Sequence, residues 1–343
     1  MHGAPRTCMK IRNQVAVVTG ASSGLGRAIA LELAGRGAHL VLAARRADAL
    51  EDTARLCRGA GGSALGVETD VTSERDVENL ARAALDAHDR IDIWINNAGV
   101  TLFSPLEDAP FEEHQRVIET NLFGAMFGAR AAIPIFRDQH RGVLINVGSV
   151  LSEVGHAFVP SYVISKFGVH GLSEALRVEV ADEPDIHVCT VFPYTLDTPH
   201  FEVAANRIER APRALPPMQP PERVARAIAR LCERPRRVRF VPRSIIVGLA
   251  LHALAPRTSE RLLLDALRRY HVDVPGRRPP PITGNLFEPA RAPATMHGDR
   301  PPQLSAPRFA AWAAGRLVRI ELAAGARRVR HWLTPRRHEA QPA

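Results

Sequence analysis

Apolar and polar residues follow two alternating patterns along residues 14–242. Short runs that are apolar throughout predict buried strands, and longer stretches with apolar residues at helical spacing predict amphipathic helices. The predicted strands cover residues 15–19, 39–43, 64–68, 91–95, 143–147, 186–192 and 238–241. The predicted helices cover residues 24–36, 47–58, 73–88, 111–139, 161–180 and 221–233. Buried strands separated by helices indicate one α/β domain with a doubly wound, seven-stranded parallel sheet.

The alternating pattern ends after residue 241. Residues 244–255 and 258–270 predict two extra helices, and residues 309–333 predict a last helix with arginines between its apolar positions. Residues 275–307 are rich in proline and arginine, which is typical of a poorly ordered linker. The longest apolar run, residues 245–255, is too short to cross a bilayer, which needs about 20 residues. We also expect no secretory signal, because the N-terminus lacks a long apolar stretch.

The positive charge is concentrated near the C-terminus. The 343 residues carry a net charge of +9, and residues 276–343 contain 12 Arg against 4 acidic residues. The rest of the chain is therefore almost neutral, whereas a DNA-binding domain would carry basic charge on its folded surface. We expect no nucleic-acid partner. The four cysteines (Cys8, Cys57, Cys189 and Cys232) form no C-x-x-C pair, which predicts no metal site and favours reduced thiols in the cytoplasm.

A glycine-rich loop joins the first predicted strand to the first helix. It reads Thr19-Gly20-Ala21-Ser22-Ser23-Gly24-Leu25-Gly26. At this spacing Gly20 permits a tight turn, Gly24 lets the backbone approach a pyrophosphate, and Gly26 lets the helix pack closely on the sheet. The helix N-terminus then presents free N–H groups and a positive dipole to the phosphates. Its place between a strand and a helix indicates a dinucleotide site.

The end of the second predicted strand bears on the choice of dinucleotide. An acidic residue there usually holds a free ribose 2′-hydroxyl, whereas arginine accommodates a 2′-phosphate. This chain reads Ala43-Ala44-Arg45-Arg46 at that point. The two arginines could be ordinary exposed residues, but basic charge at a helix N-terminus is mildly unfavourable without an anion. We therefore expect NADP(H) to be favoured over NAD(H).

A serine, a tyrosine and a lysine follow the fifth predicted strand. Ser149 lies just beyond the carboxyl end of the strand, and Tyr162 and Lys166 are four residues apart on one helix face. A phenol ordinarily has a pKa of about 10, which a nearby ammonium lowers. That would suit Tyr162 to proton transfer. Ser149 can donate a hydrogen bond to a substrate oxygen on which charge develops.

Together these motifs resemble those of the short-chain dehydrogenase/reductase family. In chain order they are the loop at 19–26, Asp70-Val71, Asn96-Asn97-Ala98-Gly99, Asn121, Ser149 and Tyr162-x-x-x-Lys166. The resemblance implies a Rossmann-like fold, with residues 10–242 as an NAD(P)-binding catalytic domain. Residues 1–9 are then an N-terminal tail, in which Met9 is a second candidate start. Residues 243–275 are a helical extension, and residues 276–343 are a basic tail with an amphipathic helix.

The resemblance also implies roles for single residues. Tyr162 would be the general acid/base, Ser149 would orient the carbonyl, and Lys166 would bind the nicotinamide ribose and lower the pKa of Tyr162. Asn121 would hold a water molecule between Lys166 and solvent, and Asp70 would contact the adenine. The expected cofactor-binding residues are Gly20, Ser22, Ser23, Gly24, Leu25, Gly26, Arg45, Arg46, Asp70, Val71, Asn97, Ala98, Gly99, Tyr162, Lys166, Pro193 and Thr198.

One motif departs from the family pattern. The family usually has P-G-x-x-x-T after the sixth strand, whereas this chain reads Pro193-Tyr194-Thr195-Leu196-Asp197-Thr198. Thr198 is still expected to bond the nicotinamide carboxamide, but Tyr194 adds a phenol near the substrate entrance. Residues 194–221 are either a lid over a bulky, largely apolar substrate or a surface excursion without substrate contact.

The sequence therefore predicts an NADP(H)-dependent oxidoreductase that interconverts a carbonyl and an alcohol. The alternative is a catalytically silent NADP(H)-binding regulatory or scaffold protein. We expect a homo-oligomer in the cytoplasm. The basic tail, with Trp312 and Trp332 on its last helix, predicts either peripheral contact with an anionic membrane or a partner-binding or solubilising role. The tail is expected to be loosely attached and unnecessary for hydride transfer.

Overall fold

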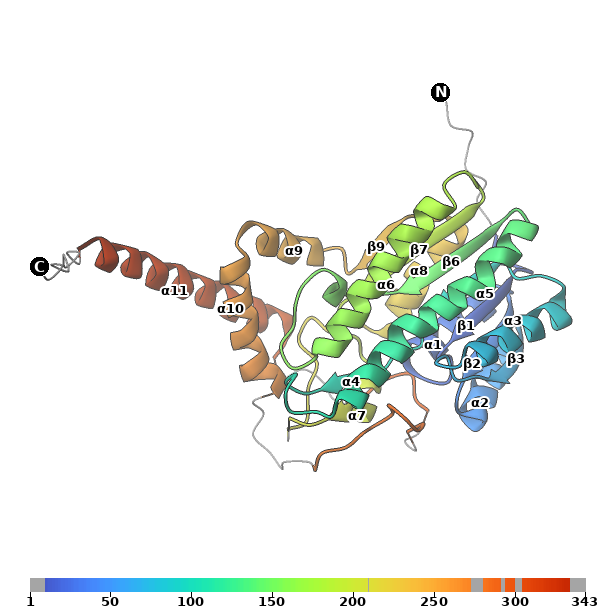
Figure 1. The fold of residues 1–343 in the computed structure, drawn as a ribbon, viewed down its shortest axis with the longest axis horizontal. Coiled ribbons are helices and arrows are strands. Elements are labelled where there is room, and N and C mark those ends of the chain that lie inside the picture. The colour runs from blue at the N-terminus through green and yellow to red at the C-terminus, as the bar shows by residue number, and fades with distance from the viewer. Residues whose placement is uncertain (1–9, 209, 273–279, 291–293, 300–303, 334–343) are drawn as a thin grey trace, which may run out of the picture.

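The computed structural model describes residues 10–208, 210–272, 280–290, 294–299 and 304–333. Its centre is a seven-stranded sheet in the order β3-β2-β1-β4-β6-β7-β9, and every neighbouring pair of strands is parallel (Figure 1). The strands are β1 (Val15–Thr19), β2 (His39–Ala44), β3 (Ser63–Glu68), β4 (Ile93–Asn96), β6 (Gly142–Val147), β7 (Ile186–Pro193) and β9 (Val238–Val241). The predicted doubly wound sheet is confirmed.

Helices cover both faces of the sheet. On one face lie α1 (Gly24–Ala34), α2 (Ala47–Gly59) and α8 (Pro221–Glu233), and on the other α3 (Glu74–His88), α5 (Gly124–Asp138) and α6 (Pro160–Glu179). Alternate residues of a strand face opposite layers. In β1, Val18 packs with Ile29 of α1, whereas Val17 packs in the layer of Phe136 from α5. Apolar side chains on both faces explain why the strands are apolar throughout.

The predicted helix over 111–139 is interrupted. The chain forms α4 (Phe111–Ile118), a π-helical turn at Glu119–Phe123, and then α5. Within the turn, the Asn121 side chain accepts a hydrogen bond from the Val100 N–H (2.8 Å) and donates to the Val100 carbonyl (3.0 Å). π-Helical turns are rare and occur often at functional sites. This one aims a buried amide at the loop that follows β4.

Two short strands escaped the sequence analysis. β5 (Leu102–Phe103) and β8 (Ala205–Asn206) form a separate two-stranded parallel sheet. The segment before β8 contains the single-turn helix α7 (His200–Val203), and a 3-10 turn at Val150–Ser152 follows β6. Elements this short carry no periodic signal. The β5–β8 pairing holds the expected lid against the chain that follows β4.

In the described part of the chain, three helices follow β9, as expected. They are α9 (Ile245–Leu254), α10 (Pro256–Ala266), which continues into a π-helical turn at Leu267–Val272, and α11 (Ala306–Leu333). They lie together at one end of the molecule (Figure 1). Trp312 of α11 packs edge-on against Tyr270, with ring centroids 5.1 Å apart. Trp312 is thus engaged inside this helical unit. No helix in the described part of the chain is long and apolar enough to cross a membrane.

The segment between α10 and α11 differs most from expectation. Its described residues 280–290 and 294–299, called the strap from here on, pack against the catalytic domain instead of hanging loosely. Leu286 is completely buried in a cluster that includes Val100 and Val117. Backbone carbonyls of the strap also accept hydrogen bonds from Arg45 and Arg46 of the catalytic domain. Such contacts depend on the tertiary fold, so the proline- and arginine-rich composition did not reveal them.

Candidate active site

A single cavity of about 580 Å³ runs along the carboxyl ends of the strands. Doubly wound sheets bind their ligands at this edge. Each predicted catalytic or cofactor-binding residue lines this cavity, with the exception of Asn121. Asn121 is buried next to the cavity and does not line it, and its amide also donates to the Ser165 hydroxyl (2.9 Å). The sequence motifs therefore converge in space although they are spread over 180 residues of chain.

The glycine-rich loop forms one end of the cavity. Gly20 has a φ of +67°, which favours glycine, and a Cβ on Gly26 would lie 2.0 Å from the Gly20 carbonyl oxygen. Asn97 braces the loop by donating from its amide to the Thr19 carbonyl (2.9 Å). The loop therefore turns tightly into α1 and leaves a cradle that side chains would fill. This geometry fits the pyrophosphate of a dinucleotide.

Basic side chains gather beside the loop at the end of β2. Arg45 is half-buried, and burial lowers its pKa. The negative charge of Asp70 opposes this lowering, and the positive charge of Arg116 adds to it. Arg116 of α4 donates to a carboxylate oxygen of Asp70 (2.8 Å). Burial acts to raise the pKa of Asp70. Hydrogen bonds from Thr72 and the charges of Arg116 and Arg45 outweigh burial, so the pKa is lowered. The sequence analysis did not identify Arg116 as a site residue, because it belongs to no motif.

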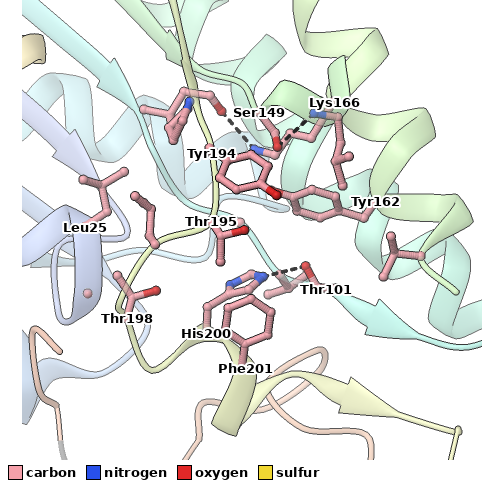
Figure 2. A pocket seen from close by; sticks show the side chains of 18 of the residues that line it. Leu25, Thr101, Ser149, Tyr162, Lys166, Tyr194, Thr195, Thr198, His200 and Phe201 are labelled. Atoms are coloured by element: carbon pink, nitrogen blue, oxygen red, sulfur yellow. Dashed lines mark hydrogen bonds between the residues drawn. The ribbon is translucent and has the colours of Figure 1, made fainter. Parts of the chain in front are cut away.

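Ser149, Tyr162 and Lys166 meet at the middle of the cavity (Figure 2). Ser149 follows β6, and the other two project from one face of α6, with the Lys166 ammonium 5.5 Å from the centre of the Tyr162 ring. Lys166 donates to the Val147 carbonyl (2.9 Å). The end of β6 and one face of α6 therefore bring the three side chains together.

Burial shifts the pKa values of both Tyr162 and Lys166. It raises the pKa of Tyr162 to about 12, although the hydrogen bond with Ser149 acts to lower it. It lowers the pKa of Lys166 to about 8. We expected Lys166 to lower the pKa of Tyr162, but the effect of burial is larger and the pKa is raised. A phenol with a raised pKa stays protonated at neutral pH, and so is a proton donor there.

A second polar group faces Tyr162 across the cavity. The hydroxyl of Thr101 lies 2.6 Å from Nε2 of His200, whose ring stands edge-on to Tyr162 with centroids 6.1 Å apart (Figure 2). Burial, with a smaller effect of the Lys166 charge, lowers the pKa of His200 to about 4, so the imidazole is neutral at pH 7. The sequence analysis missed both residues, because nothing distinguishes His200 among the 14 histidines.

Beyond Tyr162 the cavity is mainly apolar. Its walls come from the predicted lid and from all three C-terminal helices, with Tyr194, Phe201, Leu215, Leu249, Leu263 and Phe309 among the lining residues. The Tyr194 hydroxyl reaches the Pro216 carbonyl (3.4 Å), which ties the start of the lid to its later part. The C-terminal helices are thus part of the site, a role that the sequence analysis did not predict.

Comparison with known proteins identifies the family. The sequence profile of the short-chain dehydrogenases matches residues 14–208, which is more than half of the chain. The chain belongs to the short-chain dehydrogenase family. The matched range includes every motif from the glycine-rich loop to Thr198. The seven-stranded Rossmann fold and an NAD(P)-dependent oxidoreductase acting on CH–OH groups are therefore established for this chain.

Several relatives resemble the chain in sequence. The oxidoreductase YxnA of Bacillus subtilis is 36% identical over 257 residues, which are 74% of this chain and 72% of YxnA. The 3beta-hydroxysteroid dehydrogenase 1 of Eggerthella lenta is 37% identical over 191 residues, 55% of this chain and 73% of the relative.

Solved structures agree on the fold. A short-chain dehydrogenase/reductase of Burkholderia phymatum in complex with NAD has a TM-score of 0.67 and 26% identity, covering 72% of this chain and 95% of its own. An alcohol dehydrogenase of Thermococcus sibiricus complexed with 5-hydroxy-NADP has a TM-score of 0.58 and 29% identity, covering 67% and 95%. These structures support a nicotinamide cofactor. They contain both NAD and NADP forms, so they leave the preference open.

Proposed function

We propose that the chain is an NADP(H)-dependent oxidoreductase that interconverts a bulky, largely apolar ketone and its alcohol. The observation that carries this proposal is the meeting of Ser149, Tyr162 and Lys166 in one cavity with the glycine-rich loop. When bound, the nicotinamide supplies or accepts the hydride. The residues around the loop, with Asn97 to Gly99 and Thr198, would hold it. Asp70 would hold the adenine end.

The side chains of the site have separate tasks in this proposal. The Tyr162 phenol donates its proton to the carbonyl oxygen during reduction and takes it back during oxidation. Ser149 donates a hydrogen bond to the same oxygen as negative charge develops on it. The Lys166 ammonium holds the nicotinamide ribose and stabilises the phenolate left behind. Asn121 lies beside Gly99, as Lys166 does, which suits a water-mediated proton relay.

A catalytically silent NADP(H)-binding protein is the alternative. Loss of catalysis normally removes at least one acting side chain, and here the four are intact and clustered, so the alternative is not favoured. Turnover of a panel of ketones with NADPH and with NADH tests the choice. Tight binding of NADPH without turnover of any panel member would favour the silent protein.

The arginines at the end of β2 support the NADP preference. A cluster of partly buried guanidinium groups is stabilised by an anion, and a guanidinium pairs bidentately with a phosphate but not with a bare ribose. We expect Arg45→Ala/Arg46→Ala to raise the Kd for NADP⁺ on the order of 100-fold, with a much smaller effect on NAD⁺. Isothermal titration calorimetry measures both constants.

The matched control for this pair lies on α2, the helix that begins directly after Arg46. Arg55 and Arg58 of α2 have exposed side chains that pair with Asp52 and Glu51, and neither lines the cavity. Arg55→Ala/Arg58→Ala should leave both dissociation constants unchanged. Equal losses for NADP⁺ and NAD⁺ in the Arg45/Arg46 variant would show that these arginines do not read the 2′-phosphate.

The apolar half of the cavity supports a bulky substrate. The Eggerthella lenta relative is named as a hydroxysteroid dehydrogenase, and a steroid is a bulky, largely apolar molecule. Leu249 of α9 lines this half, so Leu249→Trp should lower kcat/KM for a steroid ketone by about tenfold or more while sparing a small ketone. Val247 lies on the same helix, is 74% exposed and does not line the cavity, which makes Val247→Trp the control. Equal losses for the small and the large ketone would contradict this assignment.

Two further expectations concern the surface. Exposed apolar side chains on α5 and α6, among them Met126, Ile164 and Phe167, favour a homo-oligomer in which a second copy covers them.

Contact with an anionic membrane stays a prediction. Trp312 is half-buried and packs against Tyr270, while Trp332 lies where side chains are outside the described part. The three described cysteines are free and buried, in keeping with the predicted cytoplasmic location.

A further inference from the structure

The strap is anchored at its first end beside the lid. Ile282 forms an antiparallel bridge with Asn206 of β8, with N–O distances of 2.9 and 3.1 Å. The Asn285 N–H donates to the Val203 carbonyl (2.9 Å), and Gly284 adopts a φ of +51° at this point. Leu286 then enters the protein and is fully buried. This end is held by backbone pairing and by an apolar plug.

The second anchor lies near Thr198. The His297 ring lies between two carboxylates, 2.8 Å from Asp197 and 2.9 Å from Glu222. The Asp299 N–H donates to a carboxylate oxygen of Glu202 (2.9 Å). Both ends of the strap are therefore attached to the catalytic domain, and both contact the lid residues around α7, at Val203 and at Glu202.

Between the anchors, the strap meets the residues expected to bind phosphate. Arg45 donates to the carbonyls of Asn285 (2.6 Å), Leu286 (3.2 Å) and Phe287 (3.1 Å). Arg46 donates to the Ala290 carbonyl (3.0 Å), and the Gly24 N–H at the start of α1 donates to the Thr295 carbonyl (2.9 Å). These contacts set the direction of both guanidinium groups.

The strap covers the cavity without filling it. Asn285, Pro289, Ala290 and Ala294 line the cavity on the strap side, and the glycine-rich loop, Asp70 and Asn97 line it on the domain side. Arg46 also forms an ion pair with Asp48 (3.0 Å), while the carbonyls that Arg45 meets carry only partial charge and do not neutralise its guanidinium group. A guanidinium has five N–H donors, so Arg45 keeps donors for a phosphate after its three bonds to the strap.

We propose that the strap is the outer wall of the dinucleotide site. It positions Arg45 and Arg46 for the 2′-phosphate and encloses the adenosine half of NADP(H), so that the dinucleotide leaves only after the strap detaches. Positioning of this kind strengthens binding because the arginines are already ordered. The inference rests on the proposed NADP(H) site and adds a segment that the family motifs do not include.

Removal of the apolar plug tests the proposal. Leu286→Asp places a carboxylate in a fully buried position and should release the strap, whereas Leu254→Asp makes the same change at the end of α9, at a side chain that is 87% exposed and does not line the cavity. The full-length protein is loaded with NADPH and chased with excess NADP⁺, and the fluorescence of bound NADPH is followed. We expect Leu286→Asp to dissociate NADPH about tenfold faster or more, since changes at a binding surface act mainly on dissociation. Leu254→Asp should stay close to the wild type.

A second variant and a second measurement keep the test decisive. Gly284→Val acts at the first anchor, because its Cβ would lie 2.4 Å from the Val203 carbonyl oxygen, and it should reproduce the faster dissociation. Hydrogen exchange at the Ile282 and Asn285 amides reports release of the strap without any cofactor. Release with unchanged dissociation, or with tighter NADPH binding, overturns the proposal, the latter because the strap would then compete with the dinucleotide. A wild type that binds no NADPH would instead refute the proposed function.

Discussion

Tyr162→Phe is expected to lower kcat by about 10³- to 10⁴-fold, the upper part of the range for general acid–base catalysis. The substitution removes only the phenolic hydroxyl that lies next to Ser149, so no proton donor remains at the carbonyl oxygen. The glycine-rich loop, Arg45 and Lys166 are unchanged, and the Kd for NADP⁺ should stay close to the wild-type value. Steady-state turnover and calorimetry measure the two quantities.

Tyr194→Phe is the matched control for Tyr162→Phe. Both phenols line the cavity, but the Tyr162 hydroxyl is hydrogen-bonded to Ser149, whereas the Tyr194 hydroxyl contacts the Pro216 carbonyl. Tyr194→Phe should therefore keep most of its turnover. Retention of more than a few per cent of the wild-type rate by Tyr162→Phe would remove the assigned role.

Ser149→Ala is expected to lower kcat by about 10²- to 10³-fold, the typical cost of one donor to a developing oxyanion. KM should change little, because the hydrogen bond is stronger in the transition state than in the ground state. Ser149→Thr keeps a hydroxyl at the same position and should recover part of the loss. Loss of the same size in both variants, with lowered thermal stability, would indicate that Ser149 acts through the 3-10 turn that it caps.

The sequence analysis succeeded where signals are local. Buried strands and amphipathic helices each have their own period, so the seven strands and the order of the layers followed from residues 14–242. The site motifs succeeded for a related reason. Parallel strands place their carboxyl ends at one edge, so Gly20, Asn97 and Ser149 had to come together there.

The structure added what depends on distant contacts. The π-helical turn at Asn121 exists because its amide bonds to Val100, 21 residues away in the chain. The strap is held by Arg45, about 240 residues earlier in the chain. His200 faces Tyr162 only because the β5–β8 pair positions the lid. None of these contacts has a periodic or compositional signal, which is why a segment rich in proline and arginine was interpreted as loosely attached.

The inclusion of the strap and the C-terminal helices changes the picture of the domain. The predicted catalytic unit ended at residue 242, yet residues from α9, α10, α11 and the strap line the same cavity as Tyr162. In the function that we propose, cofactor exchange and substrate selection involve this region outside the family motifs.

Transfer of an isotopic label tests the central claim most directly. The full-length protein is incubated with a steroid ketone and NADPH that carries deuterium at the transferable position of the nicotinamide, and the product is analysed by mass spectrometry. The account predicts an alcohol with one deuterium on the carbinol carbon from the wild type and almost none from Tyr162→Phe. Consumption of NADPH without a labelled alcohol, or equal labelling by both proteins, would contradict it.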